Sequence, residues 1–212
     1  MPGEAALAVG AVKLHPPPAF PGMTIGLLGG SFNPPHAGHM HISEVALKRL
    51  GLDRLWWLVT PGNPLKTKRD TASFTRRLVQ AQKLARHPRI DVTGFEASRG
   101  SAYTADMLTF LTRRYPGTRF IWVMGADNLV TFHHWRHWRE ILGLVSVAVI
   151  DRPGYRYAAR AGIAAQCFAG AYVDESDASG LYRYQPPAWT FLSAPLSALS
   201  SSGLRANAIS ES

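Results

Sequence analysis

The sequence predicts an α/β protein whose strands form a doubly wound parallel sheet. Short apolar runs alternate with segments of helical periodicity over most of the 212 residues. Two of these runs, at 23–30 and 118–127, end in or next to glycine, as strands do where a tight turn leads into a helix. Strands that alternate with helices are joined by right-handed crossovers. We therefore expect a Rossmann-like single domain, with a small helical and loop subregion at its C-terminal end.

The first strand–helix–strand unit is predicted over residues 23–62. The run "MTIGLLGG" (23–30) is short and apolar, which is typical of a buried strand. From Pro35 to Leu50 the periodicity is helical, and Gly51 is a suitable C-terminal stop. The segment "LDRLWWLVTPG" (52–62) then predicts a second strand with a turn after it.

The alternation continues toward the C-terminus. Helices are predicted at 74–87, before Pro88, and then at 103–116 and 129–142. Strands are predicted at 89–96, 118–127 and 144–154. After residue 155 the pattern loosens, and 190–206 predicts one more strand, a Ser-rich loop and the start of a helix.

Composition narrows the class of protein. The net charge of +9 suggests anionic partners, either nucleic acid or phosphorylated small molecules, although the arginines are scattered. A single cysteine, Cys167, excludes an internal disulfide. No apolar run approaches a membrane span, and residues 1–22 lack the pattern of a signal peptide. We expect a flexible Pro-rich extension at 1–22, a domain at 23–212, no membrane association and a cytoplasmic location.

The stretch "GGSFNPPHAGHMH" (29–41) is the first candidate site, because it follows the first predicted strand. Gly29 and Gly30 lack Cβ atoms, so their backbone can approach a phosphate. The prolines that follow suit the start of a helix. His36 and His39, three residues apart, then lie on one face of its first turn, beside backbone N–H groups that favour an anion. This arrangement predicts a site made of hydrogen-bond donors.

Other interpretations of these motifs are weaker. The stretch matches neither the dinucleotide fingerprint nor a P-loop. His36 and His39 could bind a metal, but no third ligand lies nearby in sequence. His133 and His137 in "HHWRHW" (133–138) are four apart, which permits a zinc site, yet a solvated helix face is the simpler interpretation. We predict no protein-held metal.

Six segments together resemble the bacterial nicotinate-nucleotide adenylyltransferases. They are "GSFNPPHAGH" (30–39), "TPGNPLK" (60–66), "AYTADML" (102–108), "MGADNLVTFHHW" (124–135), "RPGY" (152–155) and "LSSSGLR" (199–205). The first is the nucleotidyltransferase turn with its His-x-x-His pair. The others follow in the family's order and spacing, so that the resemblance covers about residues 24–205. Each segment alone is weak evidence for the family, whereas six segments in the family's order and spacing are specific evidence for it.

The resemblance implies a reaction and its participants. ATP and nicotinate mononucleotide would give the deamido dinucleotide and pyrophosphate, with Mg²⁺ bound through the ATP phosphates. Nucleic acid and membranes would not be partners, and the sequence does not decide between a monomer and a homo-oligomer. The nucleophile is a phosphate oxygen that is ionised near neutral pH, so the chemistry needs positioning and charge neutralisation rather than a general base.

The resemblance also implies three groups of site residues. The catalytic group would consist of His36, His39 and Arg205. The two histidines would hold phosphates and stabilise charge at the reacting phosphorus, and Arg205 would bind the β- and γ-phosphates. The ATP-binding group would consist of Gly29, Gly30, Ser31, Phe32, Gly125, Asp127, Ser201 and Ser202. The group that binds the mononucleotide would consist of Lys66, Tyr103, Thr104, Trp135 and Arg136.

Alternatives stay open from the residues alone. Ala102 and Ser202 depart from the family pattern, which has Ser and Thr there, and Gly203 weakens the start of the helix that carries Arg205. A pantetheine-phosphate adenylyltransferase or a cytidylyltransferase would share the His-x-x-His turn. Nicotinamide mononucleotide could be the substrate. A basic nucleic-acid-binding domain and an inactive descendant are the alternatives from other classes, although no RNP, KH or zinc-finger signature is found.

Overall fold

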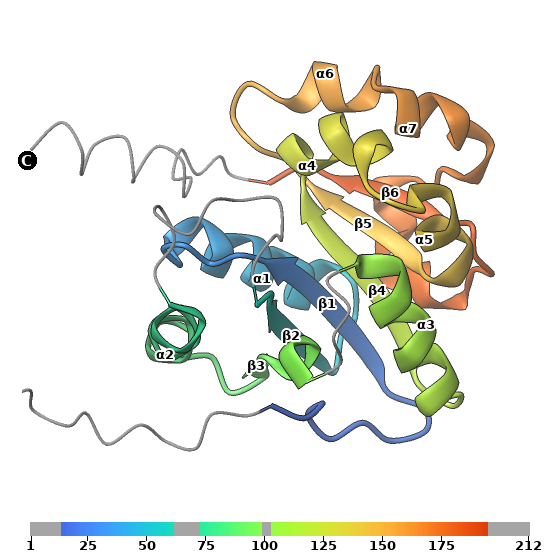
Figure 1. The fold of residues 1–212 in the computed structure, drawn as a ribbon. Helices are drawn as coiled ribbons and strands as arrows, with labels where there is room; N and C mark the ends of the chain where they lie inside the picture. The colour runs from blue at the N-terminus through green and yellow to red at the C-terminus, as the bar shows by residue number, and fades with distance from the viewer. Residues whose placement is uncertain (1–13, 62–72, 99–102, 195–212) are drawn as a thin grey trace, which may run out of the picture.

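The chain folds around one sheet of six parallel strands. The computed structural model describes residues 14–61, 73–98 and 103–194. The strand order is β3-β2-β1-β4-β5-β6, and all neighbouring pairs are parallel (Figure 1). The strands are β1 (Thr24–Gly30), β2 (Arg54–Val59), β3 (Ile90–Thr93), β4 (Arg119–Gly125), β5 (Ser146–Ile150) and β6 (Trp189–Leu192). The predicted doubly wound α/β fold is confirmed.

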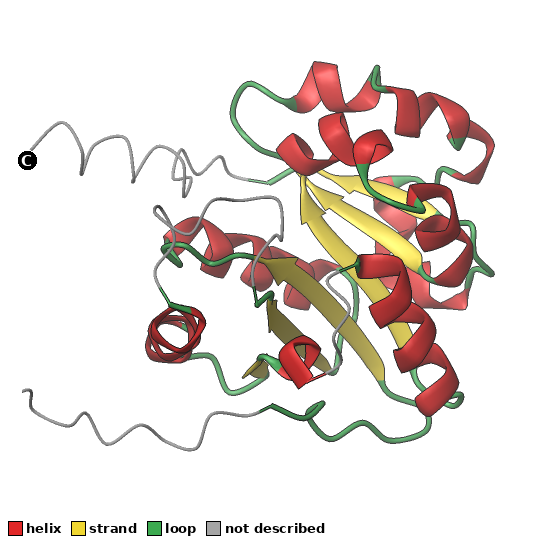
Figure 2. Cartoon of the chain, in the orientation of Figure 1, coloured by secondary structure: helices red, strands yellow, loops and turns green. Residues whose placement is uncertain are grey.

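Helices cover both faces of the sheet, which makes three layers (Figures 1 and 2). Buried side chains on one face come from α1 (Ala37–Arg49), α2 (Phe74–Leu84) and the 3₁₀ helix η4 (Glu175–Arg183). Those on the other face come from α3 (Thr104–Arg114), α4 (Ala126–Thr131), α5 (Trp138–Leu144), α6 (Arg156–Arg160) and α7 (Ile163–Cys167). Three short 3₁₀ turns complete the elements: η1 (Phe95–Ser98), η2 (Phe132–His134) and η3 (Ala169–Ala171).

The central strands are buried on both faces, because each contributes side chains to both cores. Successive side chains of a strand point to opposite faces. Trp56 therefore packs in the core under α3, while its neighbour Trp57 packs in the core under α1. Both indoles are fully buried. This explains why the strands appear in the sequence as continuous apolar runs rather than as alternating ones.

The strand order places a crevice at the carboxyl ends of β1 and β4. The chain builds outward from β1 through β2 to β3, then crosses to β4 and continues in the opposite direction. Helices that follow β1 and β4 leave on opposite faces, so their connections diverge there. This is the point at which open α/β sheets bind ligands. Gly29 and Gly30 end β1, and Gly125 ends β4.

The prediction of one continuous helix at 129–142 is wrong. The segment is instead divided into α4, η2 and α5, with Trp135 in an extended conformation and His137 at a φ of 56°. Its aromatic residues Phe132, Trp135 and Trp138 are spaced by three. In an ideal α-helix, side chains three residues apart point in directions that differ by about 60°, so the three rings would not face one side. A break between the two helices lets all three rings contact the same core. His133 and His137 consequently do not share a helix face.

Other differences are local. The predicted strand 89–96 is shorter and passes into η1. The helices α6, α7 and η4 after residue 155 were not predicted, because each is short and depends on tertiary packing of small side chains such as Ala159 and Ala165. The predicted loop and helix start after residue 194 lie outside the described residues.

The described part of the N-terminal segment lies against the domain. The carbonyl oxygen of His15 accepts a hydrogen bond from the Thr93 hydroxyl at 2.9 Å. Gly22 donates its N–H to the carbonyl of Gly117 at 2.7 Å. Pro17 is buried. The division into an extension at 1–22 and a domain at 23–212 stays a prediction.

Candidate active site

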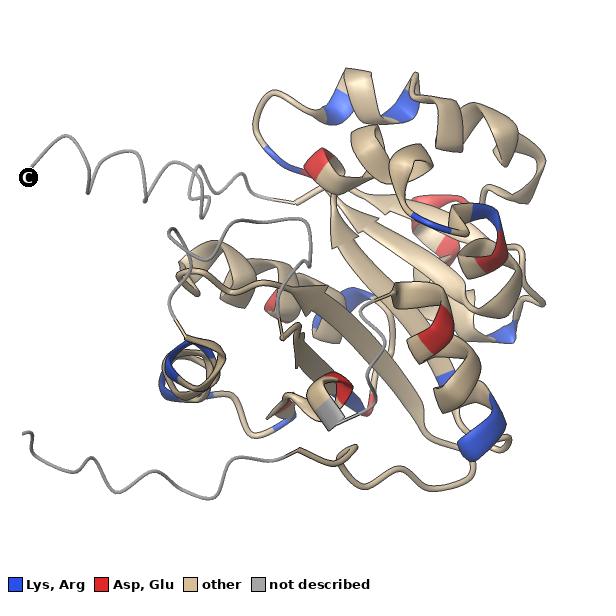
Figure 3. Cartoon of the chain, viewed as in Figure 1, with Lys and Arg blue, Asp and Glu red and all other residues tan. Residues whose placement is uncertain are grey.

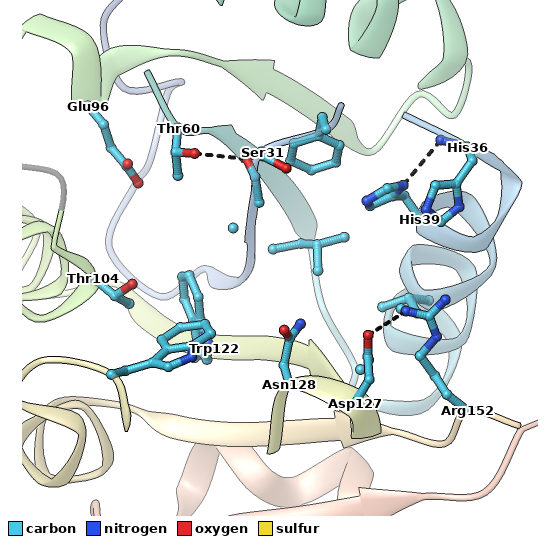
Figure 4. Close-up of a pocket in the computed structure, with 17 residues that line it drawn as sticks. Ser31, His36, His39, Thr60, Glu96, Thr104, Trp122, Asp127, Asn128 and Arg152 are labelled. Atoms are coloured by element: carbon cyan, nitrogen blue, oxygen red, sulfur yellow. Dashed lines mark hydrogen bonds and ion pairs between the residues drawn. The ribbon is translucent and has the colours of Figure 1, made fainter. Parts of the chain in front are cut away.

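A cavity of about 290 Å³ lies at the carboxyl ends of β1 and β4. The end of β1 and the turn after it line the cavity with Gly29, Gly30, Ser31 and Phe32. The end of β4 and the start of α4 line it with Gly125, Asp127 and Asn128. Figure 4 shows that the cavity has two ends. His36, His39, Asp127 and Arg152 lie at one end, called here the imidazole end. Glu96, Thr104 and Trp122 lie at the other, called here the aromatic end.

The two histidines of the predicted motif cap the helix that carries them. His36 is the N-cap of α1, and its Nδ1 accepts a hydrogen bond from the Gly38 N–H at 3.1 Å. His39 is the third helical residue, and its Nδ1 accepts from the His36 N–H at 3.2 Å. The pair thus forms a reciprocal capping box, a role usually taken by Ser or Thr with Glu. The rings lie close together, with centroids 3.9 Å apart.

This capping fixes the proton on each ring. A nitrogen that accepts a hydrogen bond carries no proton, so the neutral form of each imidazole has its proton on Nε2. Burial lowers the pKa of His36 to about 4, with the Arg152 charge as a second cause, and lowers the pKa of His39 to about 3, with His36 as its second cause. Both rings are therefore uncharged at neutral pH. Each ring keeps one N–H donor, at Nε2, and both rings line the cavity.

Neighbouring side chains hold the His39 ring in place. Phe32 lies 4.6 Å from it, centroid to centroid, and stacks on Trp57 behind it. The Trp57 indole N–H donates to the Ser43 hydroxyl, which in turn donates to the His39 carbonyl, both at 2.7 Å. Phe32 has a φ of 46°, a conformation that a bulky residue adopts only under constraint from its surroundings. Phe32 is 1 % exposed, so its ring belongs to the core under α1 as well as lining the cavity.

Asp127 and Arg152 form an ion pair at the imidazole end. The Arg152 guanidinium donates to Asp127 Oδ2 at 2.8 Å, and the other carboxylate oxygen, Oδ1, is buried without a hydrogen-bond partner among the described residues. Gly125 makes room for this pair. A Cβ atom at Gly125 would lie 2.5 Å from Asp127 Oδ1 and 2.8 Å from Arg152 Cδ. The glycine that ends β4 is therefore required by the ion pair.

The sequence suggests that Gly29 lets the backbone approach a phosphate, but in the structure a neighbouring side chain explains the glycine. A Cβ atom there would lie 2.4 Å from the Trp122 ring. The close neighbour of this glycine is thus an indole of β4, which lines the same cavity. A Cβ at Gly30 would meet the Phe32 ring at an ordinary distance of 3.5 Å.

Arg77 supports the turn after β1 from behind. It lies on α2 and is 2 % exposed. Its guanidinium donates to the carbonyl oxygens of Ser31, Thr60 and Pro61, which follow β1 and β2. One buried cation therefore fixes both turns and adds positive potential near the cavity.

The aromatic end is formed by indoles and three polar side chains. Trp135 and Trp122 both line it and contact each other edge to face, with centroids 6.2 Å apart. Thr104, the first residue of α3, and Thr60, which follows β2, contribute hydroxyls. Glu96 of η1 contributes a carboxyl, and burial raises its pKa to about 7. Trp135 is half-buried and also packs on Phe132, so it serves the core and the cavity together.

Tyr103 and Arg136 lie next to the aromatic end but are not among its lining residues. Tyr103 precedes the lining residue Thr104, and Arg136 follows the lining residue Trp135. The Arg136 guanidinium stacks over the Tyr103 ring at 4.5 Å from its centroid. Both side chains are exposed. The structure thus brings these two predicted residues together outside the cavity, while their roles stay predictions.

The structure gathers most of the predicted site residues that it describes. Ten of them line one cavity: Gly29, Gly30, Ser31, Phe32, His36, His39, Thr104, Gly125, Asp127 and Trp135. Four lie outside the described residues: Lys66, Ser201, Ser202 and Arg205.

Sequence reasoning missed further residues of the cavity. Arg152 follows β5 and Thr60 follows β2, and the position at a strand's carboxyl end could have indicated both. Asn128 lies one residue beyond a predicted one. Trp122 and Glu96 gave no local signal, because one is inside a strand and the other in an irregular turn.

Three further observations bear on the class of protein. Among the residues described, no group of three or more His, Cys, Asp or Glu side chains is arranged to hold a metal. None of the helices in the described ranges has the length and apolar character to cross a membrane. Figure 3 shows the basic residues scattered over several helices and loops, together with acidic residues, rather than gathered in one place.

Comparison with known proteins identifies the family of this chain. The cytidylyltransferase-like family model matches residues 27–207. A probable nicotinate-nucleotide adenylyltransferase of Methylorubrum extorquens (strain PA1) is 60 % identical over 86 % of this chain and 99 % of its own. The protein of the same name from Agrobacterium fabrum is 52 % identical over 87 % of this chain and 99 % of its own.

Solved structures share the fold. The nicotinic acid mononucleotide adenylyltransferase of Plasmodium falciparum, solved in complex with NaAD, superposes with a TM-score of 0.65 over 87 % of this chain and 83 % of its own, at 16 % identity. Since the family model matches most of the chain and the named relatives are more than half identical over nearly their whole length, this chain belongs to the cytidylyltransferase-like family and, within it, to the nicotinate-nucleotide adenylyltransferases.

Proposed function

We propose that this chain transfers the adenylyl group of ATP to nicotinate mononucleotide, a step of NAD biosynthesis. A phosphate oxygen of the mononucleotide attacks the α-phosphorus of ATP. The new P–O bond forms as the bond from the α-phosphorus to the bridging oxygen breaks, and pyrophosphate leaves with that oxygen. Deamido-NAD is the other product. Family membership and the two-ended cavity support this reaction.

One observation carries the proposal: two uncharged imidazoles present Nε2–H donors at the crevice between β1 and β4. Charge accumulates on the oxygens of the α-phosphate as the nucleophile approaches. Donors that are already oriented and desolvated stabilise this charge without reorganisation. The capping hydrogen bonds supply the orientation, and burial supplies the desolvation. A general base is not needed, because the nucleophile is already ionised.

The two ends of the cavity suit the two substrates. We expect the triphosphate at the imidazole end, where Arg152 and the turn held by Arg77 add positive charge. The Asp127 Oδ1 atom, which has no partner in the described part of the chain, suits a ribose hydroxyl, because a hydroxyl donates to a carboxylate. We expect the pyridine ring at the aromatic end, against Trp135, with Thr104 near its carboxylate.

Mg²⁺ is expected to arrive with ATP, bound through phosphate oxygens, where it neutralises phosphate charge. The described carboxylates that line the cavity are Glu96 and Asp127. Asp127 already pairs with a guanidinium, and Glu96 lies at the opposite end. This donor set fits a metal held by the nucleotide rather than by a protein cage.

The test is pyrophosphate release by the purified chain with ATP and Mg²⁺. Nicotinate mononucleotide, nicotinamide mononucleotide and phosphopantetheine are supplied in parallel. We expect release with the first and much slower release with the other two. Release with phosphopantetheine alone would assign the chain to a sister activity. The absence of release with all three would contradict the proposal.

A further inference from the structure

Glu96 is a buried carboxyl that faces the cavity and that the proposed reaction does not use. It is 6 % exposed. No hydrogen bond or ion pair joins it to any other residue of the described ranges. Figure 4 shows its carboxyl group directed into the cavity, on the side of Thr60 and Thr104. A carboxyl that is shielded from bulk water, lines a cavity and has no partner in the described ranges is available to a ligand that fills the cavity.

Burial determines which form of this carboxyl is present. An isolated carboxylate ion in an apolar setting is disfavoured, and burial raises the pKa of Glu96 to about 7. Near neutral pH the acid form is therefore well populated. Unlike a carboxylate, the acid form donates one hydrogen bond.

Within residues 14–61, 73–98 and 103–194, no ion pair joins a charged group of a neighbouring element to Glu96. Arg77 of α2 donates to three backbone carbonyls. Asp91 of β3 pairs with Arg54 of β2, Asp106 of α3 is exposed, and Arg136 stacks on Tyr103. The titratable groups that line the rest of the cavity, His36, His39, Asp127 and Arg152, lie at its imidazole end.

We propose that Glu96 determines the preference for the acid over the amide form of the pyridine mononucleotide, by donating its carboxyl proton in a hydrogen bond to the pyridine carboxylate. This inference rests on the proposed function, which places the pyridine ring at the aromatic end. A hydrogen bond between a carboxyl group and a carboxylate is charge-assisted and strong. An ionised Glu96 would instead place two like charges together. The amide substrate carries no charge there, so its binding does not depend on this proton.

This arrangement makes the preference depend on pH. The ratio of kcat/KM for nicotinate mononucleotide to that for nicotinamide mononucleotide should be constant below about pH 7. Above that pH the ratio should fall by roughly tenfold per pH unit, because the fraction of enzyme with a protonated Glu96 falls tenfold with each unit. Ionisation of ATP, of the shared phosphate group and of the histidines affects both substrates alike and cancels in the ratio.

The kinetic test compares the full chain with Glu96→Gln and with Glu44→Gln between about pH 6 and 9. Glu44 is an exposed residue of α1 and serves as the matched control. Glutamine keeps the size of Glu96 and donates a hydrogen bond at every pH. We expect the ratio to become independent of pH in Glu96→Gln and to follow the unsubstituted chain in Glu44→Gln. A ratio that is already flat in the unsubstituted chain would overturn the proposal, as would equal slowing of both substrates with the pH dependence retained.

A binding measurement separates this proposal from the proposed function. Calorimetry in two buffers of different ionisation enthalpy measures the protons taken up when each mononucleotide binds. At about pH 8 the acid form should bind with close to one proton more than the amide form, and Glu96→Gln should abolish the difference. An equal uptake for the two mononucleotides would overturn the role of Glu96 even if turnover is seen. Failure of pyrophosphate release with a retained difference would contradict only the proposed reaction.

Discussion

At the scale of single residues, the histidine pair has two roles that occupy different ring nitrogens. The Nδ1 atoms of His36 and His39 cap α1, which leaves the Nε2–H groups as the donors that the proposed reaction uses. Capping typically contributes about 1 kcal/mol to the stability of a helix. An oriented donor to a developing negative charge contributes about 3 to 4 kcal/mol to catalysis. The same side chain can therefore be tested for each role separately.

Two substitutions at His39 separate the roles. In His39→Asn the side-chain oxygen replaces the Nδ1 acceptor and the distal donor is lost. We expect turnover to fall by about 10² to 10³, with little change in thermal stability. In His39→Gln the distal donor is kept and the acceptor is displaced, so we expect a loss of about 1 kcal/mol of stability and a smaller loss of turnover. Measurement of kcat, ATP affinity and melting temperature checks both. Equal turnover in the two variants would contradict the donor role.

At the scale of elements, the site depends on turns that follow parallel strands and on what holds them. Gly125 ends β4 where Asp127 and Arg152 need space. Arg77 of α2 fixes the turns after β1 and β2 through their carbonyl oxygens. Neither residue is predicted to touch the reacting atoms. Each positions a turn whose backbone and side chains line the cavity.

A methyl group at Gly125 should disturb the ion pair. In Gly125→Ala the new Cβ would lie 2.5 Å from Asp127 Oδ1, so the pair must shift. We expect the KM for ATP to rise about tenfold or more, which corresponds to about 1.4 kcal/mol. Gly143→Ala is the control, because a Cβ at this position of α5 meets nothing within 4 Å. That variant should be neutral or more stable by about 0.5 to 1 kcal/mol. An unchanged KM in Gly125→Ala would show that Asp127 and Arg152 do not contribute to ATP binding.

Removal of the Arg77 guanidinium should loosen both turns. Arg77→Met keeps most of the aliphatic volume and leaves three carbonyl oxygens without this donor. We expect a loss of about 2 to 4 kcal/mol in the free energy of unfolding, together with reduced turnover. Arg76→Met, the exposed neighbour on α2, should change stability by less than about 0.5 kcal/mol. Denaturant unfolding of both variants provides the measurement, and equal stability would contradict the supporting role of Arg77.

At the scale of the whole molecule, the groups in the cavity affect stability in opposite directions as pH changes. His36 and His39 have lowered pKa values, so the unfolded chain binds more protons than the folded one below about pH 6.5, and acid destabilises the fold. Glu96 has a raised pKa of about 7. The folded chain therefore binds more protons at Glu96 between its unfolded value and pH 7, and stability falls as pH rises through this window.

Replacement of Glu96 should consequently stabilise the protein at alkaline pH. Glu96→Gln removes the cost of a buried carboxylate ion, which is on the order of 3 kcal/mol above pH 7 for a shift of this size. Near pH 4.5 the advantage should disappear, because the acid form is then present in both states. Melting temperatures of the two proteins at about pH 4.5 and 8 provide the comparison. A stability difference that is the same at both pH values would show that Glu96 does not titrate in this window.

The sequence by itself determined the fold and indicated residues at both ends of the cavity. Apolar runs that end at glycines predicted the strands, and helical periodicity predicted α1, α2 and α3, because these signals depend on neighbours a few residues apart. The position of His36 and His39 after the first strand was predictable for the same reason. The six motifs in register then indicated the family, which the comparisons confirm.

Tertiary structure alone decided which side chains share the cavity. Glu96, Trp122 and Arg152 come from three different elements and meet only because the sheet places their ends together. The break between α4 and α5 and the short helices after residue 155 likewise depend on packing against a core formed by distant residues. Burial also determined the chemistry of the titratable groups, since the same histidine or glutamate in water would keep its ordinary pKa. Local periodicity specifies elements, whereas burial and close approach arise only when those elements pack together.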